Sequence, residues 1–291
     1  MTTTFDLIQL PSIARYRRPN LIWSSSTLVS VETGIVDGTS GDATILFSDG
    51  NLRTETSASR YDMIITQNAV FNNASLGNNQ GGLRTGSATS NTWYACYAVK
   101  CTQFPANWVL VADTVLPIPS NYATLNTNFG FNSWNYLGLI RYGDNDNFTS
   151  SIINFVQTGN VTILLPQTNA FNYGGGGCGI QMAFTSAASS LAYTYSAGTG
   201  STNIANNISQ VYWGFYASQA GASPWVVVST QFNTHALLTS LSYPNTELGM
   251  SQIWSPASGG LSLTNSGSGE LAIYIAGWTD NALGVGSNPL F

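Results

Sequence analysis

The sequence predicts an all-β fold, an antiparallel β-sandwich of the jelly-roll kind in one or two lobes, with an extended N-terminal arm. Runs rich in Val, Ile, Thr, Tyr, Phe and Trp alternate bulky residues with small or polar ones, as strands do. Clusters of Gly, Asn, Asp and Ser separate these runs at intervals of about 8 to 12 residues. Helical periodicity is nearly absent, and its best candidate, residues 202–209, is as compatible with a loop.

The first half of the chain contains several such runs. Residues 20–36 hold two short β-prone runs around a Ser-rich turn, and residues 43–47 follow the turn-forming segment DGTSGD. Further strands are expected within residues 61–71, 92–101 and 107–113, because each segment is aromatic or β-branched and is bounded by turn residues. These runs predict the first layers of the sandwich.

Residues 134–160 predict a hairpin that continues as an antiparallel meander through a TGN turn. A glycine between two leucines leaves room for another strand to approach closely, and an arginine at the strand end can reach carbonyl groups or the aspartates of its own turn. The residues expected to build this structural hairpin are Trp134, Gly138, Arg141, Asp144 and Asp146.

The second half of the chain keeps the same character. Strands are expected at residues 180–184, 191–197, 210–218, 224–230, 260–267 and 270–278. The chain divides into an N-terminal anchoring arm, a β-sandwich lobe and a second β-rich portion, at residues 1–20, 21–168 and 169–291. The glycine run at 174–179 is the best boundary between lobes, and a long bend within one sandwich is the alternative.

The composition points to a neutral surface. Charged residues make up 7% of the 291 residues, against about 25% in ordinary soluble domains, and the net charge is −5. Faces rich in Ser, Thr, Asn and Gly suit permanent packing against other subunits better than life as a free monomer. Eight basic residues provide no phosphate-binding field, so a nucleic-acid partner is not expected.

The N-terminal segment combines apolar and basic residues, which predicts an anchor to a larger partner rather than a solvated arm. No run of 18 apolar residues suggests a membrane span, and the start lacks the pattern of a secretory signal, so synthesis in the cytoplasm is expected. The residues assigned to the anchor are Phe5, Leu7, Ile8, Leu10, Arg15, Arg17 and Arg18.

The sequence offers little for catalysis. One histidine and three cysteines cannot form a zinc site, and Cys96 and Cys101 would lie on opposite faces of a strand, too far apart to bridge. The segment GGGGCG is followed by a strand pattern instead of the helix that a dinucleotide site needs. His235 has no nucleophile motif and is expected at a strand end. No cofactor, metal or catalytic residue is therefore predicted.

Four segments in order resemble a structural module of tailed-phage virion proteins. The segment GGLRTGSATSNTWYACYAV (81–99) contains G-G-L-x-T-G-S and N-T-W-Y, and LPIPSNY (116–122) provides the extended P-x-x-Y piece. Residues 134–161 contain aromatic-x-G-x-[IV]-R, an Asp/Asn turn and F-x-Q-x-G-[ND]. YIAGWTD (274–280) is similar to the module's closing G-W-x-D strand. The resemblance is strongest over residues 20–166.

The resemblance implies a non-enzymatic virion component of a tailed bacteriophage, made in the host bacterial cytoplasm. Such a protein is a tail-fibre or head-fibre part or a capsid decoration (cement) protein, β-rich and usually a homotrimer. Its expected partners are its own copies and other virion proteins, with neither nucleic acid nor membrane. A receptor- or glycan-binding adhesin at a fibre tip, with a host-surface glycan as partner, is the alternative. A capsule depolymerase, which would need a carboxylate pair in a groove, is a third interpretation.

Overall fold

A computed structural model of the chain describes the following ranges: 18–34, 41–56, 62–64, 81–83, 87–101, 108–114, 131–143, 151–165, 180–195, 204–205, 207–217, 225–232, 235–242, 252–256 and 258–280. Every regular element within these ranges is a β-strand, and all strand pairs but one are antiparallel, which confirms the all-β class. In the described residues no helix is long and apolar enough to cross a lipid bilayer.

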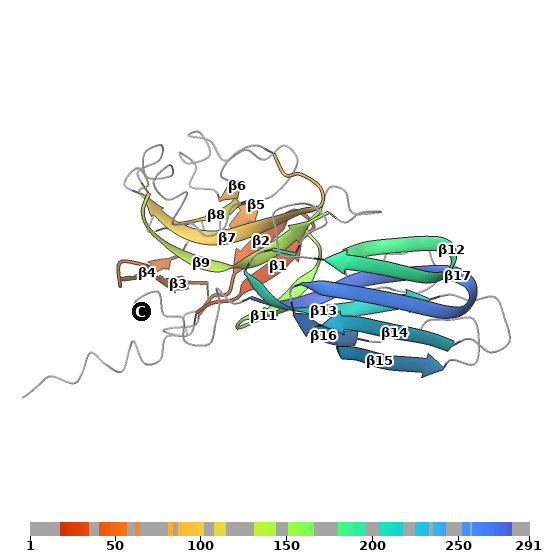
Figure 1. The fold of residues 1–291 in the computed structure, drawn as a ribbon. Coiled ribbons are helices and arrows are strands. Elements are labelled where there is room, and N and C mark those ends of the chain that lie inside the picture. Colours follow the sequence, from red (N-terminus) through yellow and green to blue (C-terminus); the bar gives the residue numbers. More distant parts are fainter. Residues whose placement is uncertain are drawn as a thin grey trace, which may run out of the picture.

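In the described ranges eleven strands form the N-terminal body, drawn from red to light green in Figure 1. Their bounds are β1 (Leu21–Ser25), β2 (Leu28–Val31), β3 (Ala43–Leu46), β4 (Leu52–Glu55), β5 (Asp62–Ile64), β6 (Gly82–Leu83), β7 (Thr92–Cys101), β8 (Val109–Asp113), β9 (Phe131–Tyr142), β10 (Phe155–Thr158) and β11 (Val161–Leu164). One sheet has the order β6-β8-β7-β9, with β6 and β8 parallel, and β3 and β4 form a separate pair. The remaining strands pair in the order β5-β2-β1-β10-β11.

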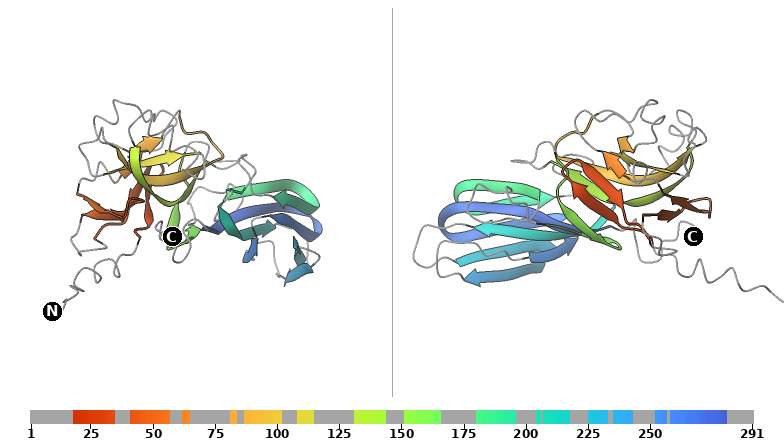
Figure 2. Two further views of the ribbon diagram at one scale, coloured as in Figure 1. Left: turned by 60° about the vertical axis from the view of Figure 1, so that its left-hand side comes forward. Right: turned by 180° about the vertical axis from the view of Figure 1, so that it is seen from behind.

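The C-terminal body, drawn from green to blue, lies beside the first in all views of Figures 1 and 2. Its strands are β12 (Ile180–Tyr195), β13 (Ile208–Ala217), β14 (Trp225–Phe232), β15 (His235–Ser242), β16 (Gln252–Pro256) and β17 (Gly259–Asp280). The long strand β17 is central: it pairs with β12 on one edge, and with β14 and β13 in succession on the other. The outermost strands are β15, beside β14, and β16, beside β13.

The β12–β17 ribbon doubles back on itself. Tyr195 pairs with Gly259 and Trp213 pairs with Ile275, so a straight β17 would separate these positions by about 50 Å at about 3.3 Å per residue. The ring centroids of Tyr195 and Trp213 nevertheless lie 4.6 Å apart. Register shifts in the middle of the ribbon provide the bend, which Figure 1 shows at the end of this body farthest from β1. The two halves of the ribbon therefore face each other around a buried aromatic core.

The predicted hairpin at residues 134–160 is divided between two sheets. β9 pairs with β7, whereas β10 pairs with β1 and β11, and β10 and β11 form the predicted turn-linked pair. Only the base of a β9–β10 hairpin exists, as an isolated bridge between Tyr142 and Ile152. Elsewhere on this edge of β9 a backbone group from the β3–β4 turn binds instead, while the bond from Ile153 belongs to the base of the hairpin. Ser48 N–H donates to Trp134 O at 3.0 Å, and Ile153 N–H donates to Arg141 O at 3.2 Å.

Most predicted strands match the structure, and β7 matches residues 92–101 end to end. The segments 180–184 and 191–197 merge into β12, and the segments 260–267 and 270–278 merge into β17, because bulges carry the chain through the intervening small residues. The short strands β4 and β6 and the outer strands β15 and β16 had no sequence prediction. His235 begins β15, at the strand end where it was expected. The predicted boundary at residue 168 and the glycine run at 174–179 lie outside the described residues.

Residues 18–20, which the sequence assigned to the arm, are tied to the body. Arg18 Nη1 donates to Tyr136 O at 3.5 Å. Asn20 donates through both its backbone N–H and Nδ2 to Glu32 Oε2, at 3.1 and 2.8 Å. Asn20 Oδ1 also accepts a bond from Gly159 N–H at 3.0 Å. The body thus begins at Arg18, and residues 1–17 lie outside the described part of the chain.

Candidate functional site

The site that gathers the distinctive residues of the sequence lies where β9, β10 and β17 meet, between the two bodies. Cys96 pairs with Gly138 and Tyr97 with Tyr136, so β9 has a bulge at Leu137. A bulged residue leaves its backbone groups without ladder partners. Gln157 of β10 supplies one, because its Nε2 donates to Leu137 O at 3.0 Å. Its Oε1 accepts a bond from Leu21 N–H at 2.6 Å, so one buried amide links β9, β10 and β1.

Gly138 makes room for this amide. A Cβ at position 138 would lie 2.6 Å from Gln157 Nε2 and 3.3 Å from Leu21 Cδ1, which is too close for an ordinary contact. Its φ of +147° is also a conformation that favours glycine. The sequence predicted that another strand or its backbone would approach this glycine, and in the structure the approaching group is the side chain of Gln157.

A second cluster of polar side chains joins the two bodies. The Tyr136 hydroxyl, on β9, donates a short hydrogen bond to Asp280 Oδ2 at the end of β17. Asn207, just before β13, donates through Nδ2 to the Tyr136 oxygen at 2.6 Å and to Asp280 Oδ1 at 2.8 Å. Asp280 is fully buried. Burial and the Asp280 carboxylate raise the pKa of Tyr136 well above its ordinary value, so its hydroxyl remains a hydrogen-bond donor.

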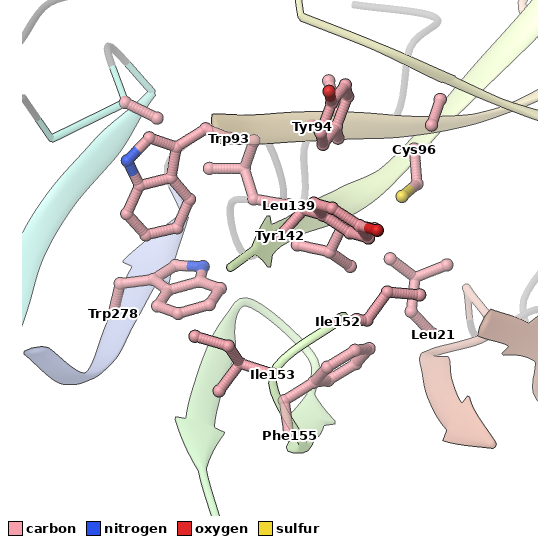
Figure 3. Packing of buried hydrophobic residues seen from close by; sticks show 14 of the residues in the cluster. Leu21, Trp93, Tyr94, Cys96, Leu139, Tyr142, Ile152, Ile153, Phe155 and Trp278 are labelled. Atoms are coloured by element: carbon pink, nitrogen blue, oxygen red, sulfur yellow. The ribbon is translucent and has the colours of Figure 1, made fainter. Parts of the chain in front are cut away.

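An aromatic and cationic contact also connects the two bodies. We call the region where β9, β10 and β17 meet, including this contact and the two polar clusters above, the joint. The rings of Trp93, on β7, and Trp278, on β17, meet edge to face with centroids 4.9 Å apart, as Figure 3 shows. The Arg141 guanidinium, buried on β9, lies 5.2 Å from the centroid of the Trp93 ring. Tyr193 of β12 lies near Arg141; burial raises the pKa of Tyr193 to about 12, and the Arg141 charge opposes that rise.

The apolar surroundings of the joint form one continuous core. In Figure 3 Leu21 of β1, Phe155 of β10 and Ile152, which precedes β10, face Cys96 of β7 and Leu139 of β9. These side chains belong to a cluster of buried residues that also includes Trp213 and Tyr195 of the C-terminal body. Cys96 is an unbridged thiol whose burial raises its pKa far above the ordinary value. The thiol is therefore an apolar packing group in this core.

A glycine also allows β17 to join the N-terminal body. Ile163 of β11 pairs with Gly277, and a Cβ at Gly277 would lie 2.5 Å from Thr162 O. Because that contact is with backbone, a side chain could be accepted only if the strands moved apart. Beyond it, Asp280 N–H donates to Asn160 O at 2.8 Å and fixes the strand end to the β10–β11 turn.

The residues expected to build the hairpin have different positions in the structure. Trp134 is half-buried and contacts the Tyr97 ring edge to face, with centroids 6.3 Å apart. Gly138 and Arg141 are both in the joint. Asp144 and Asp146 lie outside the described residues. So do all the residues assigned to the N-terminal anchor except Arg18, namely Phe5, Leu7, Ile8, Leu10, Arg15 and Arg17.

The sequence did not single out several residues of the joint, yet a signal for them was present. Each lies in one of the ordered motifs: Trp93 in N-T-W-Y, Tyr136 with Gly138 in aromatic-x-G, and Gln157 in F-x-Q. The closing G-W-x-D motif contributes Gly277, Trp278 and Asp280. Segments that are distant along the chain thus meet in one buried joint. Asn207 belongs to none of the motifs, and no pattern in the sequence distinguishes it.

The chemistry of the joint is that of fixed orientation. Its carboxylate and phenol are buried, its Asn207 amide is partly buried, and these groups bind one another, so they hold strands in register. Within the described ranges, no group of three or more His, Cys, Asp or Glu side chains could hold a metal ion. No protein-family model matches the chain. The search of curated proteins finds no match either.

Proposed function

We propose that the chain is a non-enzymatic structural protein of a tailed-phage virion, a fibre part or a decoration protein that packs as a homotrimer. Its partners in this proposal are its own copies and neighbouring virion proteins, with residues 1–17 as the attachment segment. Four of the ordered motifs support it, because residues of N-T-W-Y, aromatic-x-G-x-[IV]-R, F-x-Q and G-W-x-D meet in one structural joint instead of lining a reactive centre. That convergence is the observation that carries the proposal.

The strand order of the C-terminal body supports a jelly roll. The bend divides the β12–β17 ribbon into two halves. The half that contains Ile275 of β17 pairs onward to β13 and then β16, and the half that contains Leu261 of β17 pairs onward to β14 and then β15. With each half of the ribbon counted separately, this gives two sets of four strands that face each other across the Tyr195–Trp213 contact. Eight strands in two layers are the make-up of the jelly rolls found in viral capsid and lectin domains.

The described surface supports packing between subunits. Among the β12 side chains whose burial the structure describes, the exposed ones are Ser190, Ala192 and Thr194, which are small and uncharged. On the N-terminal body Ser24 and Ser30 bind each other through their hydroxyl groups, 2.8 Å apart, on adjacent strands. Such faces can lie against other protein surfaces without desolvating charges.

The proposal is tested on particles and on the isolated protein. The chain should be found by mass spectrometry in purified virions of the phage that encodes it, at a fixed ratio to the capsid protein. Sedimentation equilibrium of the isolated chain should give three times 31.0 kDa. A variant without residues 1–17 should remain folded and trimeric and should not join particles. Absence of the full-length chain from virions would refute the proposal, and a monomer at micromolar concentration would refute the trimer.

A receptor- or glycan-binding fibre tip is the second candidate, because lectins share the jelly-roll arrangement. Sugar rings stack on exposed aromatic side chains, yet the large apolar side chains exposed in the described residues are Ile22, Leu52 and Val156. A glycan array of the full chain separates the two candidates. Specific binding would favour the tip, and release of reducing sugar from host polysaccharide would instead indicate a depolymerase.

A further inference from the structure

The strand β17 belongs to both bodies. Within the C-terminal body it pairs with β12 from Gly259 to Ile275, with β14 from Gly260 to Asn265, and with β13 from Leu271 to Asp280. From Gly277 to Thr279 it pairs on one edge with β11 of the N-terminal body, where β12 has ended. The chain therefore leaves the N-terminal body after β11 and returns to the same place, as the antiparallel neighbour of β11, only at the end of β17.

The points of departure and return are adjacent in space. Ile163 lies opposite Gly277, so the following residue on β11, Leu164, lies beside Ala276 in the antiparallel register. Opposite residues in such a pair have Cα atoms about 4.5 to 5.5 Å apart. A two-residue turn could join them directly. This is the geometry of a body inserted into another at a hairpin, a kind of site where insertions are well tolerated.

Each body also has its own internal contacts. In the N-terminal body the β6-β8-β7-β9 sheet packs on the β1–β10 region through Gln157 and the residues in Figure 3. In the C-terminal body the fully buried Trp213 contacts Tyr193 and Tyr195 across the folded ribbon, with ring centroids 6.0 and 4.6 Å away. The closing residues Trp278 and Asp280 contact Trp93 and Tyr136 of the N-terminal body through their side chains, and Asp280 also binds Asn207 of the C-terminal body.

We propose that the C-terminal body is an insert between β11 and the end of β17, carried by an N-terminal body that folds without it and closes on residues 277–280. A second part of this inference rests on the proposed function: attachment to the particle resides in the N-terminal body. The insert is then the outward unit that contacts other partners. The insert spans residues 165–275, and the last four residues of β17 close the first body on one edge while their other edge pairs with β13 of the insert.

The structural part is tested on the full chain by hydrogen exchange with mass spectrometry. Trp213→Ala removes the central ring of the insert's core, and Tyr212→Phe on the same strand is the matched control. Trp213→Ala should speed exchange in β12 and β13 by about tenfold or more while β7 and β9 keep wild-type protection. Equal loss of protection in both bodies, or loss of all structure, would overturn the proposal.

A second variant tests the division of labour. It joins Leu164 to Ala276 through Asn-Gly, a favoured two-residue hairpin turn, and lacks residues 165–275. It should be soluble, unfold cooperatively and still enter particles. An aggregated product would contradict the claim that the N-terminal body folds without the insert, and a folded product that is excluded from particles carrying the full-length chain would contradict the assignment of attachment to the N-terminal body. If the full-length chain itself is absent from particles, the proposed function fails, while the exchange result still decides the insertion.

Discussion

Gly138 and Gln157 share one space: the position that a Cβ on Gly138 would take lies 2.6 Å from Gln157 Nε2. The glycine gives up a side chain so that an amide from the other sheet can bind the bulged strand and β1 together. Both residues are buried. The packing of the two sheets of the N-terminal body therefore depends on two residues that are 19 positions apart in sequence.

Gly138→Ala should lower the free energy of unfolding by about 3 kcal/mol, the sum of backbone strain at φ +147° and displaced hydrogen bonds of Gln157. Urea unfolding followed by circular dichroism measures it. Gly260→Ala is the control, because nothing lies within 4 Å of its added Cβ. Equal effects of the two substitutions would show that the Gly138 contact is unimportant.

Gln157→Leu keeps the volume of the side chain and removes both of its hydrogen bonds. Leu21 N–H and Leu137 O would then be buried without these partners, at a cost of about 1 to 3 kcal/mol each. The urea midpoint should fall accordingly. Its neighbour Val156 is 49% exposed, so Val156→Thr should change stability by no more than about 0.5 kcal/mol. A Gln157→Leu protein as stable as wild type would contradict the bridging role.

Tyr136 makes stability depend on alkaline pH. Its pKa is raised in the folded state, so the unfolded chain loses this proton first as pH rises past the ordinary tyrosine value of about 10. Stability should therefore be constant in this respect below about pH 9 and should fall above about pH 10. Tyr136→Phe should make that fall shallower, because it removes up to one proton from the difference in bound protons between the folded and unfolded states. Urea unfolding from pH 8 to 11.5 measures both slopes, and identical slopes would count against the buried phenol.

Tyr136 and Asp280 should also show energetic coupling. A double-mutant cycle of Tyr136→Phe and Asp280→Asn should give an interaction energy of about 1 kcal/mol or more, because the two side chains share a buried hydrogen bond. The control is a cycle of Tyr136→Phe and Thr54→Ala. The Thr54 hydroxyl binds Thr44 on the separate β3–β4 pair, so the two effects should be additive. Additive effects for Tyr136 and Asp280 would remove the polar part of the joint.

Arg141→Lys should be strongly destabilising despite keeping the charge. The planar guanidinium lies over the Trp93 ring in a buried position, and a lysine ammonium would be more strongly hydrated there and could not stack. We expect a loss of about 2 to 4 kcal/mol and a changed near-ultraviolet tryptophan signal. Arg53, which binds Asp49 on a surface hairpin, is the control, and Arg53→Lys should cost at most about 1 kcal/mol.

The sequence by itself determined the class of fold and most strand positions. The aromatic and β-branched side chains of segments such as β7 and β13 favour the extended backbone of a strand, in which they can be buried on one or both faces of a sheet. The turn-forming residues between such segments mark where the strands end. The ordered motifs also marked most of the residues that matter in the joint. These properties are local, so a linear pattern is enough to read them.

Only the tertiary structure decided which strands meet. The segments of the expected hairpin separate into two sheets, because the edge of β9 binds the backbone of Ser48 and Ile153 and the side chain of Gln157 instead of the backbone of β10. The pairing of Gly277 with Ile163, and the hydrogen bond from Tyr136 to Asp280, join positions more than 100 residues apart. Such contacts depend on close approach and burial, which periodicity does not encode. The sequence supplied the strands and the glycines, and packing in three dimensions chose their neighbours.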